Sequence, residues 1–155
     1  EIFRANLAAG TPLGLEAKRY MESGEYVPDE VTNSMVASRL AEPDAANGFI
    51  LDGYPRTLAQ VDELDGMLTG LNTRLDKVVE ITANTDEVVA RLLNRAKEQG
   101  RADDTEEVIR RRMDVYAEQT EPLVRVYDER GLLVKVDGMG SMDEVTGRLL
   151  AALGQ

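Results

Sequence analysis

One short stretch constrains the fold most: an apolar run that ends abruptly in a turn. Residues 49–51 are Phe-Ile-Leu, followed at once by Asp-Gly and Tyr-Pro, and a helix is expected to begin at Thr57. Three apolar residues are too few for a buried helix, so the pattern predicts a buried strand ending in a tight turn. In open parallel sheets ligands bind beyond the carboxyl ends of strands. Asp52 and Arg56 are therefore candidates for a catalytic acid and an anion clamp.

The rest of the chain alternates between helical and strand patterns. Further strands are predicted at residues 77–82 and 132–136. Helices are predicted over residues 1–9, 11–24, 28–43, 57–71 and 85–96, with a long helix from Asp103 toward Gly131 and a final helix from Ser141. Expected capping signals are Thr11 before Pro12, Thr57, Thr85, Asp103 with Glu106, and Ser141 with Glu144. Pro122 is expected to kink or reset its helix. Strands alternating with helices predict an α/β domain with a parallel sheet and right-handed crossovers.

Composition narrows the class of chemistry. At 155 residues one domain is expected, and no apolar run approaches a membrane span. The absence of cysteine excludes disulfides and thiolate metal sites, and the absence of histidine leaves carboxylates as the candidate bases. We therefore expect a cytoplasmic enzyme that works by electrostatics, without a membrane partner.

The charge pattern points to a small anionic ligand. The net charge of -11 argues against nucleic-acid binding, which needs a basic surface. Fourteen of the 18 basic residues are arginines, the residue favoured for bidentate recognition of phosphate. Arg91 and Arg95 are four residues apart and share a helix face, where like charges repel unless they share an anion. Solvated helix faces are the competing interpretation for most of these arginines.

Two segments carry a family resemblance. Residues 52–57, Asp-Gly-Tyr-Pro-Arg-Thr, with Gln60, resemble the signature segment of adenylate kinases, and residues 100–104, Gly-Arg-Ala-Asp-Asp, with Arg112, resemble the family's later phosphate-binding segment. The likeness extends from residue 1 to the C-terminal helix. It implies a P-loop nucleoside-monophosphate-kinase-like, three-layer αβα fold with a parallel sheet. It also implies a monomeric, cytoplasmic enzyme that transfers a phosphoryl group from Mg-ATP to AMP, giving two ADP.

The resemblance also implies a domain layout and roles for single residues. Residues 1–27 would form the AMP-binding helical region, 28–94 and 102–155 the core, and 95–101 a short lid loop. The AMP site would comprise Arg4, Glu25, Tyr26, Val27, Gly53, Tyr54, Pro55, Arg56, Gln60, Arg101 and Arg112. The ATP site would comprise Arg91, Arg95 and Gly140, and Asp52 would hold Mg²⁺ through water. The catalytic set would be Arg56, Arg95, Arg101, Arg112 and Asp52.

From the sequence alone, several of these residues also have a simpler structural interpretation. Gln60 also fits as the third residue of a helix capped by Thr57, and one amide cannot easily serve both purposes. Asp52 also fits as a turn-forming residue before glycine, and Asp103 as only a helix cap. A noncatalytic AMP-binding or assembly module is the alternative function, and a kinase for another nucleoside monophosphate is a third, against which Gln60 argues.

Two departures from the family pattern bear on activity. The short interval between Arg95 and Arg101 implies the short lid, and the lack of cysteine and histidine excludes a zinc-binding one. No segment of the sequence fits the phosphate loop G-x-x-x-x-G-K-[ST], which the family places before the position of residue 1. We expect the encoded protein to supply it, and expect the 155-residue chain by itself to be inactive. In the family the first strand lies between the strands at 49–51 and 77–82, so a gap in the sheet is also expected.

Overall fold

A computed structural model describes residues 2–101 and 104–154. Its helices are α1 (Ile2–Ala8), α2 (Pro12–Ser23), α3 (Asp29–Leu40), the 3₁₀ turn η1 (Pro43–Asn47), α4 (Leu58–Gly70), α5 (Thr85–Gln99), α6 (Glu106–Val115), the π-helical turn η2 (Tyr116–Thr120), α7 (Glu121–Glu129) and α8 (Met142–Leu153). Its strands are β1 (Val78–Thr82) and β2 (Leu133–Asp137). No helix among the described residues is long and apolar enough to cross a membrane.

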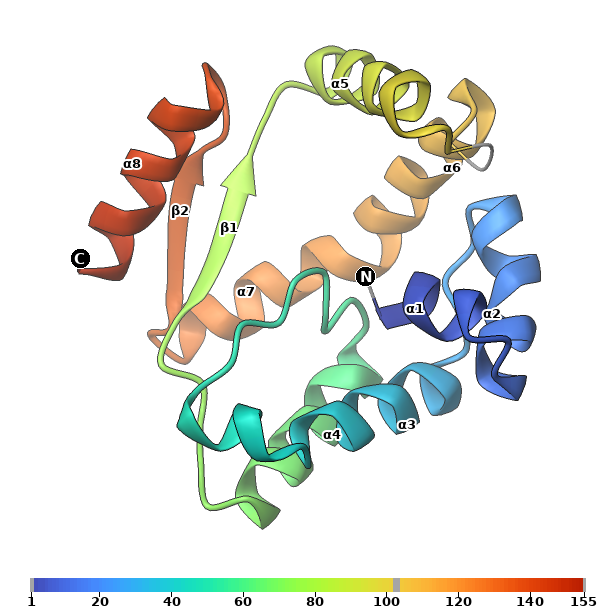
Figure 1. Cartoon of the computed structure of the whole chain (residues 1–155). Helices are drawn as coiled ribbons and strands as arrows, with labels where there is room; N and C mark the ends of the chain where they lie inside the picture. The colour runs from blue at the N-terminus through green and yellow to red at the C-terminus, as the bar shows by residue number, and fades with distance from the viewer. Residues whose placement is uncertain (1, 102–103, 155) are drawn as a thin grey trace.

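The two strands form a parallel pair, as predicted. Val78 is in register with Leu133 and Thr82 with Asp137, and the chain between the strands runs through α5, α6, η2 and α7. Helix α8 packs on β2, and β1 lies on the other side of β2 from it (Figure 1). The mixed α/β class and the parallel sheet are thereby confirmed.

The strand predicted at residues 49–51 is wrong. The described chain has no sheet pairing there, and Ile50 is 91% exposed, while Phe49 and Leu51 pack against the α3–α4 core. Strand structure requires a neighbouring strand to satisfy its backbone N–H and C=O groups, and among the described residues β1 pairs only with β2. The apolar pattern therefore predicted the partial burial of Phe49 and Leu51 correctly, but its prediction of strand pairing is wrong.

Three apolar clusters hold the helices together. Ala17, Val27 and Met35 form the first, where α1 and α2 pack on α3. Leu64 and Leu68 join α4 to α3 in the second, and the third links α4 with α7 and the strands. The first cluster crosses the domain boundary predicted at residue 27, so α3 belongs as much to the N-terminal helical region as to the core.

Most predicted helix ends are confirmed, and two are shifted. Thr11 and Thr57 cap α2 and α4 through their hydroxyls, and Ser141 forms the predicted capping box. Helix α5 is capped by Asn84, not Thr85, because the Asn84 side chain accepts from the N–H of residues 86 and 87. Helix α6 is capped by Thr105, and the predicted cap Asp103 lies outside the described residues.

The lid prediction also needs adjustment. Residues 95–99 are the last turn of α5, which ends at Gly100 in a left-handed conformation. The predicted lid loop of residues 95–101 is therefore largely helical. Further along, the reset expected near Pro122 takes the form of the π-helical turn η2 immediately before α7.

Candidate active site

A cleft of about 450 Å³ gathers most of the predicted site residues. Its predicted lining residues are Arg4, Glu25, Tyr26, Val27, Asp52, Gly53, Arg56, Gln60, Arg95, Arg101 and Arg112. Phe3, Met21, Thr32 and Leu92 also line it and were not predicted. Tyr54, Pro55, Arg91 and Gly140 are not among its lining residues. Five arginines from segments far apart in sequence thus face one cavity, which suits a polyanionic ligand.

The turn at residues 52–56 shapes the Arg56 side chain. Gly53 has a φ of 72°, and its carbonyl oxygen accepts a 2.7 Å hydrogen bond from Arg56 Nε. The left-handed φ favours glycine, and a Cβ here would lie 2.6 Å from Arg56 Nη2, so a larger residue would displace the end of the Arg56 side chain. The Arg56 guanidinium also lies 5.4 Å from the centroid of the Tyr26 ring, a cation–π distance.

Gln60 is buried and its amide is largely engaged. Its Oε1 accepts from the Arg56 backbone N–H at 2.7 Å, and its Nε2 donates to Asp29 at 2.8 Å. The second Asp29 oxygen accepts from the Thr57 hydroxyl at 3.0 Å. Gln60 is the third residue of the helix capped by Thr57, whose hydroxyl accepts from the Gln60 backbone N–H at 3.2 Å, but its side chain bonds the Arg56 N–H and not that of Thr57, so the capping box is incomplete. One Nε2 hydrogen remains for a ligand. Asp29 sets the orientation of this amide, because a carboxylate only accepts.

A buried carboxylate joins two of the cleft arginines. The Asp104 side chain is 0% exposed; it accepts from Arg95 Nη2 at 2.8 Å and forms a very short contact with Arg112 Nη1. Arg112 Nη2 also donates to the Met21 carbonyl at the end of α2, at 3.1 Å. The end of α5, the start of α6 and α2 are thereby tied together around one negative charge.

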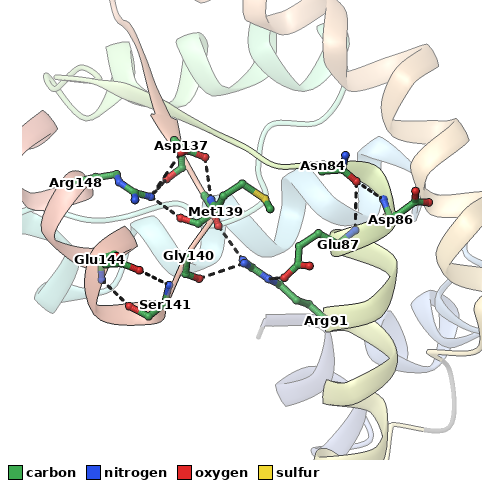
Figure 2. A network of polar contacts seen from close by, with 11 residues as sticks. Asn84, Asp86, Glu87, Arg91, Asp137, Met139, Gly140, Ser141, Glu144 and Arg148 are labelled. Carbon is green, nitrogen blue, oxygen red and sulfur yellow. Dashed lines mark hydrogen bonds and ion pairs between the residues drawn. The ribbon is translucent and has the colours of Figure 1, made fainter.

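Arg91 lies on a different surface, away from the cleft lining. Its Nη1 donates to Gly138 O at 2.8 Å, its Nη2 to Gly140 O at 3.2 Å, and its Nε to Glu87 at 2.7 Å (Figure 2). From the other side, Arg148 donates to the carbonyls of Asp137 and Met139 at 2.8 and 2.6 Å. The loop of residues 138–140 is therefore clamped between α5 and α8. The expectation that Arg91 and Arg95 face one anion together is not met by this arrangement.

Comparison with known proteins identifies the family to which the chain belongs. A model of the adenylate kinase family matches residues 1–132. An adenylate kinase of Nocardioides sp. (strain ATCC BAA-499 / JS614) is 63% identical over 153 residues, covering 99% of this chain and 80% of the relative. The chain belongs to the adenylate kinase family. Adenylate kinases of Kocuria rhizophila and Pseudarthrobacter chlorophenolicus, at 59% and 58% identity, cover 99% of this chain and 81% and 80% of their own lengths.

In this adenylate kinase family member, the described residues offer no cluster of three or more acidic side chains for a metal. Asp52 lines the cleft with an exposed carboxylate and makes no ion pair with another described residue. A single carboxylate fits Mg²⁺ that arrives with a nucleotide, because that ion keeps several waters and takes phosphate oxygens as ligands. The residues present are therefore compatible with Mg-ATP.

Sequence reasoning assigned no role to several residues that organise this kinase site. Asp29 and Asp104 orient Gln60 and the arginine pair, and Arg148 holds the 138–140 loop. Asp104 was part of the motif that carried the resemblance. Its position in the sequence between Arg101 and Arg112 could have indicated that it pairs with arginines. Tyr54, next to the turn, is a structural neighbour: burial raises its pKa to about 12, so its hydroxyl stays protonated and donates to Asn33 at 2.7 Å.

Proposed function

We propose that the cleft is where AMP and the phosphates of Mg-ATP meet, for the reversible transfer that gives two ADP. The single observation that carries this assignment is the convergence of Arg4, Arg56, Arg95, Arg101 and Arg112 on one cavity. Phosphoryl transfer needs positioning and charge neutralisation more than covalent help, so arginines and a carboxylate suffice without histidine or cysteine. The activity follows from family membership, and the assignment of residues is the proposal.

On the AMP side, the phosphate would be held by Arg4 and Arg56. The connector of residues 25–27 and the turn of residues 53–55 would form the wall beside the adenine. Gln60 would contact the adenine edge with its remaining Nε2 hydrogen, because its other groups are engaged with Asp29 and Arg56. The burial of Gln60, 3% exposed, supports a discriminating rather than a solvated amide.

On the ATP side, Arg95 would hold the phosphates from the end of α5, and Arg101 and Arg112 would lie nearest the transferred group. In the transfer, an AMP phosphate oxygen bonds to the γ-phosphorus as the bond to the β–γ bridging oxygen breaks, and the electron pair leaves with ADP. Arg91 and the Gly140 backbone would border the ATP adenine, at the loop that Arg91 braces. Bound with ATP, Mg²⁺ would neutralise charge on the phosphate oxygens, and Asp52 would hold it through water.

Paired arginine substitutions test this division of labour. Arg56→Ala should raise the apparent KM for AMP about tenfold or more with a small change for ATP, and Arg95→Ala should do the reverse. The matched control is Arg125→Ala, because Arg125 is exposed on α7 outside the cleft lining. Equal effects of Arg56→Ala on both nucleotides would contradict the assignment. AMP binding without any phosphoryl transfer would instead favour the noncatalytic module.

A further inference from the structure

The π-helical turn η2 places one hydroxyl between two parts of the AMP side. Thr120, the last residue of η2, has its Oγ1 2.5 Å from the Tyr26 hydroxyl and 2.8 Å from the Arg56 carbonyl oxygen. Tyr26 and Arg56 are 94 and 64 residues away in the sequence. Thr120 is therefore a junction between the connector, the turn and the segment that joins α6 to α7.

The direction of both hydrogen bonds follows from proton counting. A backbone carbonyl can only accept, so the single Thr120 hydroxyl hydrogen goes to the Arg56 carbonyl. The Tyr26 hydroxyl must then be the donor to Thr120 Oγ1. The result is a chain of two bonds, from Tyr26 through Thr120 to Arg56, in which each bond polarises the next.

These two hydrogen bonds restrain the groups around the Arg56 guanidinium. The Tyr26 ring that Thr120 holds by its hydroxyl is the ring that lies 5.4 Å from the guanidinium carbon. At the same time Thr120 holds the Arg56 backbone, and the Arg56 Nε is bound by Gly53. The exposed Arg56 side chain is thus restrained at its backbone, along its face and at Nε, which leaves its two terminal nitrogens for an anion.

The irregular helix is what brings Thr120 to this position. Pro122 lacks a backbone N–H, so a regular α-helical ladder cannot pass through this point unchanged, and the wider π turn ends at Thr120 with φ −102° and ψ −38°. Single π turns inside helices occur frequently at functional sites.

We propose that Thr120 is a positioning residue that sets the Arg56 guanidinium for the phosphate of AMP. The inference deepens the proposed function and rests on it, because Arg56 must contact that phosphate. A purely structural role for Thr120 would instead weaken the fold, or the whole AMP side, without distinguishing the phosphate from the nucleoside.

The test compares AMP with adenosine, which lacks the phosphate, using calorimetric dissociation constants on the full protein. Thr120→Val removes the hydroxyl at nearly constant shape and should weaken AMP binding about three- to tenfold, with adenosine binding unchanged. Thr120→Ser keeps the hydroxyl and should restore AMP binding. Tyr26→Phe should reproduce the Thr120→Val loss, and the double variant should be no weaker than either alone.

Two controls separate the outcomes. Thr146→Val removes a hydroxyl that, among the described residues, bonds only the Met142 carbonyl on α8, and should leave the binding of both ligands unaffected. Arg56→Ala checks the underlying assignment: if AMP binding is unchanged in Arg56→Ala, the proposed AMP site fails and this inference with it. If Arg56→Ala weakens AMP binding but Thr120→Val does not, only the role of Thr120 is overturned.

Equal losses for AMP and adenosine in Thr120→Val would also overturn it, as would failure of Thr120→Ser to restore AMP binding. The melting temperature of each variant is measured in parallel. Should Thr120→Val not fold, Tyr26→Phe decides the question, because it keeps the ring and removes only the donor. An unchanged AMP-to-adenosine affinity ratio in Tyr26→Phe then counts against the proposal.

Discussion

Two arginines one turn apart on α5 have opposite surroundings. Arg95 faces the cleft and pairs with the buried carboxylate of Asp104, whereas Arg91 is bound to two backbone carbonyls of the 138–140 loop and to Glu87. The Asp104 carboxylate neutralises part of the Arg95 charge and competes with an anionic ligand for the guanidinium, while the carbonyl contacts of Arg91 define the path of the backbone. One helix therefore lines the cleft with its C-terminal turn and, one turn earlier, braces a neighbouring loop.

The largest effect on stability is expected at the C-terminal turn of α5, where Arg95 lines the cleft. Asp104→Ala should lower the free energy of unfolding by about 2 to 3 kcal/mol, because it leaves Arg95 and Arg112 without their shared counter-charge. The value lies below that of a fully buried pair, since these arginines are 36% and 27% exposed. Denaturant titration measures it, with Asp143→Ala, an exposed acid on α8, as the control. A loss no larger than in the control would show that the buried carboxylate does not organise the cleft.

A second change acts on the cleft without altering any charge. Gly53→Ala places a Cβ 2.6 Å from Arg56 Nη2 and forces a residue with a side chain to adopt a φ of 72°. The left-handed conformation alone costs about 1 kcal/mol, and displacement of Arg56 should weaken AMP binding further. Gly66→Ala, on α4 with open space around its Cβ position, is the matched control. Unchanged AMP affinity in Gly53→Ala would mean that Arg56 does not need this placement.

Arg91→Ala, which acts on the loop of residues 138–140, should lower stability less and should change the KM for ATP but not for AMP. It removes the contacts to the carbonyls of residues 138 and 140, so we expect a loss of about 1 kcal/mol in stability and a severalfold higher KM for ATP. The KM for AMP should stay constant, because the AMP-side residues lie elsewhere. Arg91→Ala and Arg95→Ala compared side by side test the contrast directly: Arg95→Ala should raise the KM for ATP about tenfold or more and Arg91→Ala only severalfold, and equal increases would remove the contrast.

The smallest effect is a pH dependence at the start of α8. Hydrogen bonds from Ser141, first from its backbone N–H, hold the pKa of Glu144 below its ordinary value of 4.5. A lowered folded-state pKa means that this contribution to stability is complete above pH 4.5 and is lost as the pH falls further. Glu144→Gln should therefore reduce the loss of melting temperature between pH 5 and about pH 3. An identical pH profile in the variant would contradict a charged cap at this loop.

Predictions that rest on interactions between residues close in the sequence were confirmed more often than those that rest on residues far apart. Thr11, Thr57 and Ser141 were identified as caps because the donor groups they satisfy lie three residues away. Residues 49–51 were assigned wrongly to a strand because pairing depends on a partner distant in the sequence. The cap of α5 was misplaced by one residue, since Asn84 and Thr85 are both competent caps and only the backbone path selects between them.

By itself the sequence determined the chemistry available to the candidate site. It has many arginines, one carboxylate, Asp52, in the turn of residues 52–56, no thiol or imidazole, and two motifs that resemble those of adenylate kinases. The tertiary structure decided how that chemistry is divided. It placed Arg95 in the cleft and Arg91, one helical turn away, against the loop of residues 138–140, inserted Asp104 between two arginines, and brought Thr120 to Tyr26 and Arg56. The physical reason is that residue type sets what a group can bond, while its partner is set by the packing of segments that lie up to 94 residues apart.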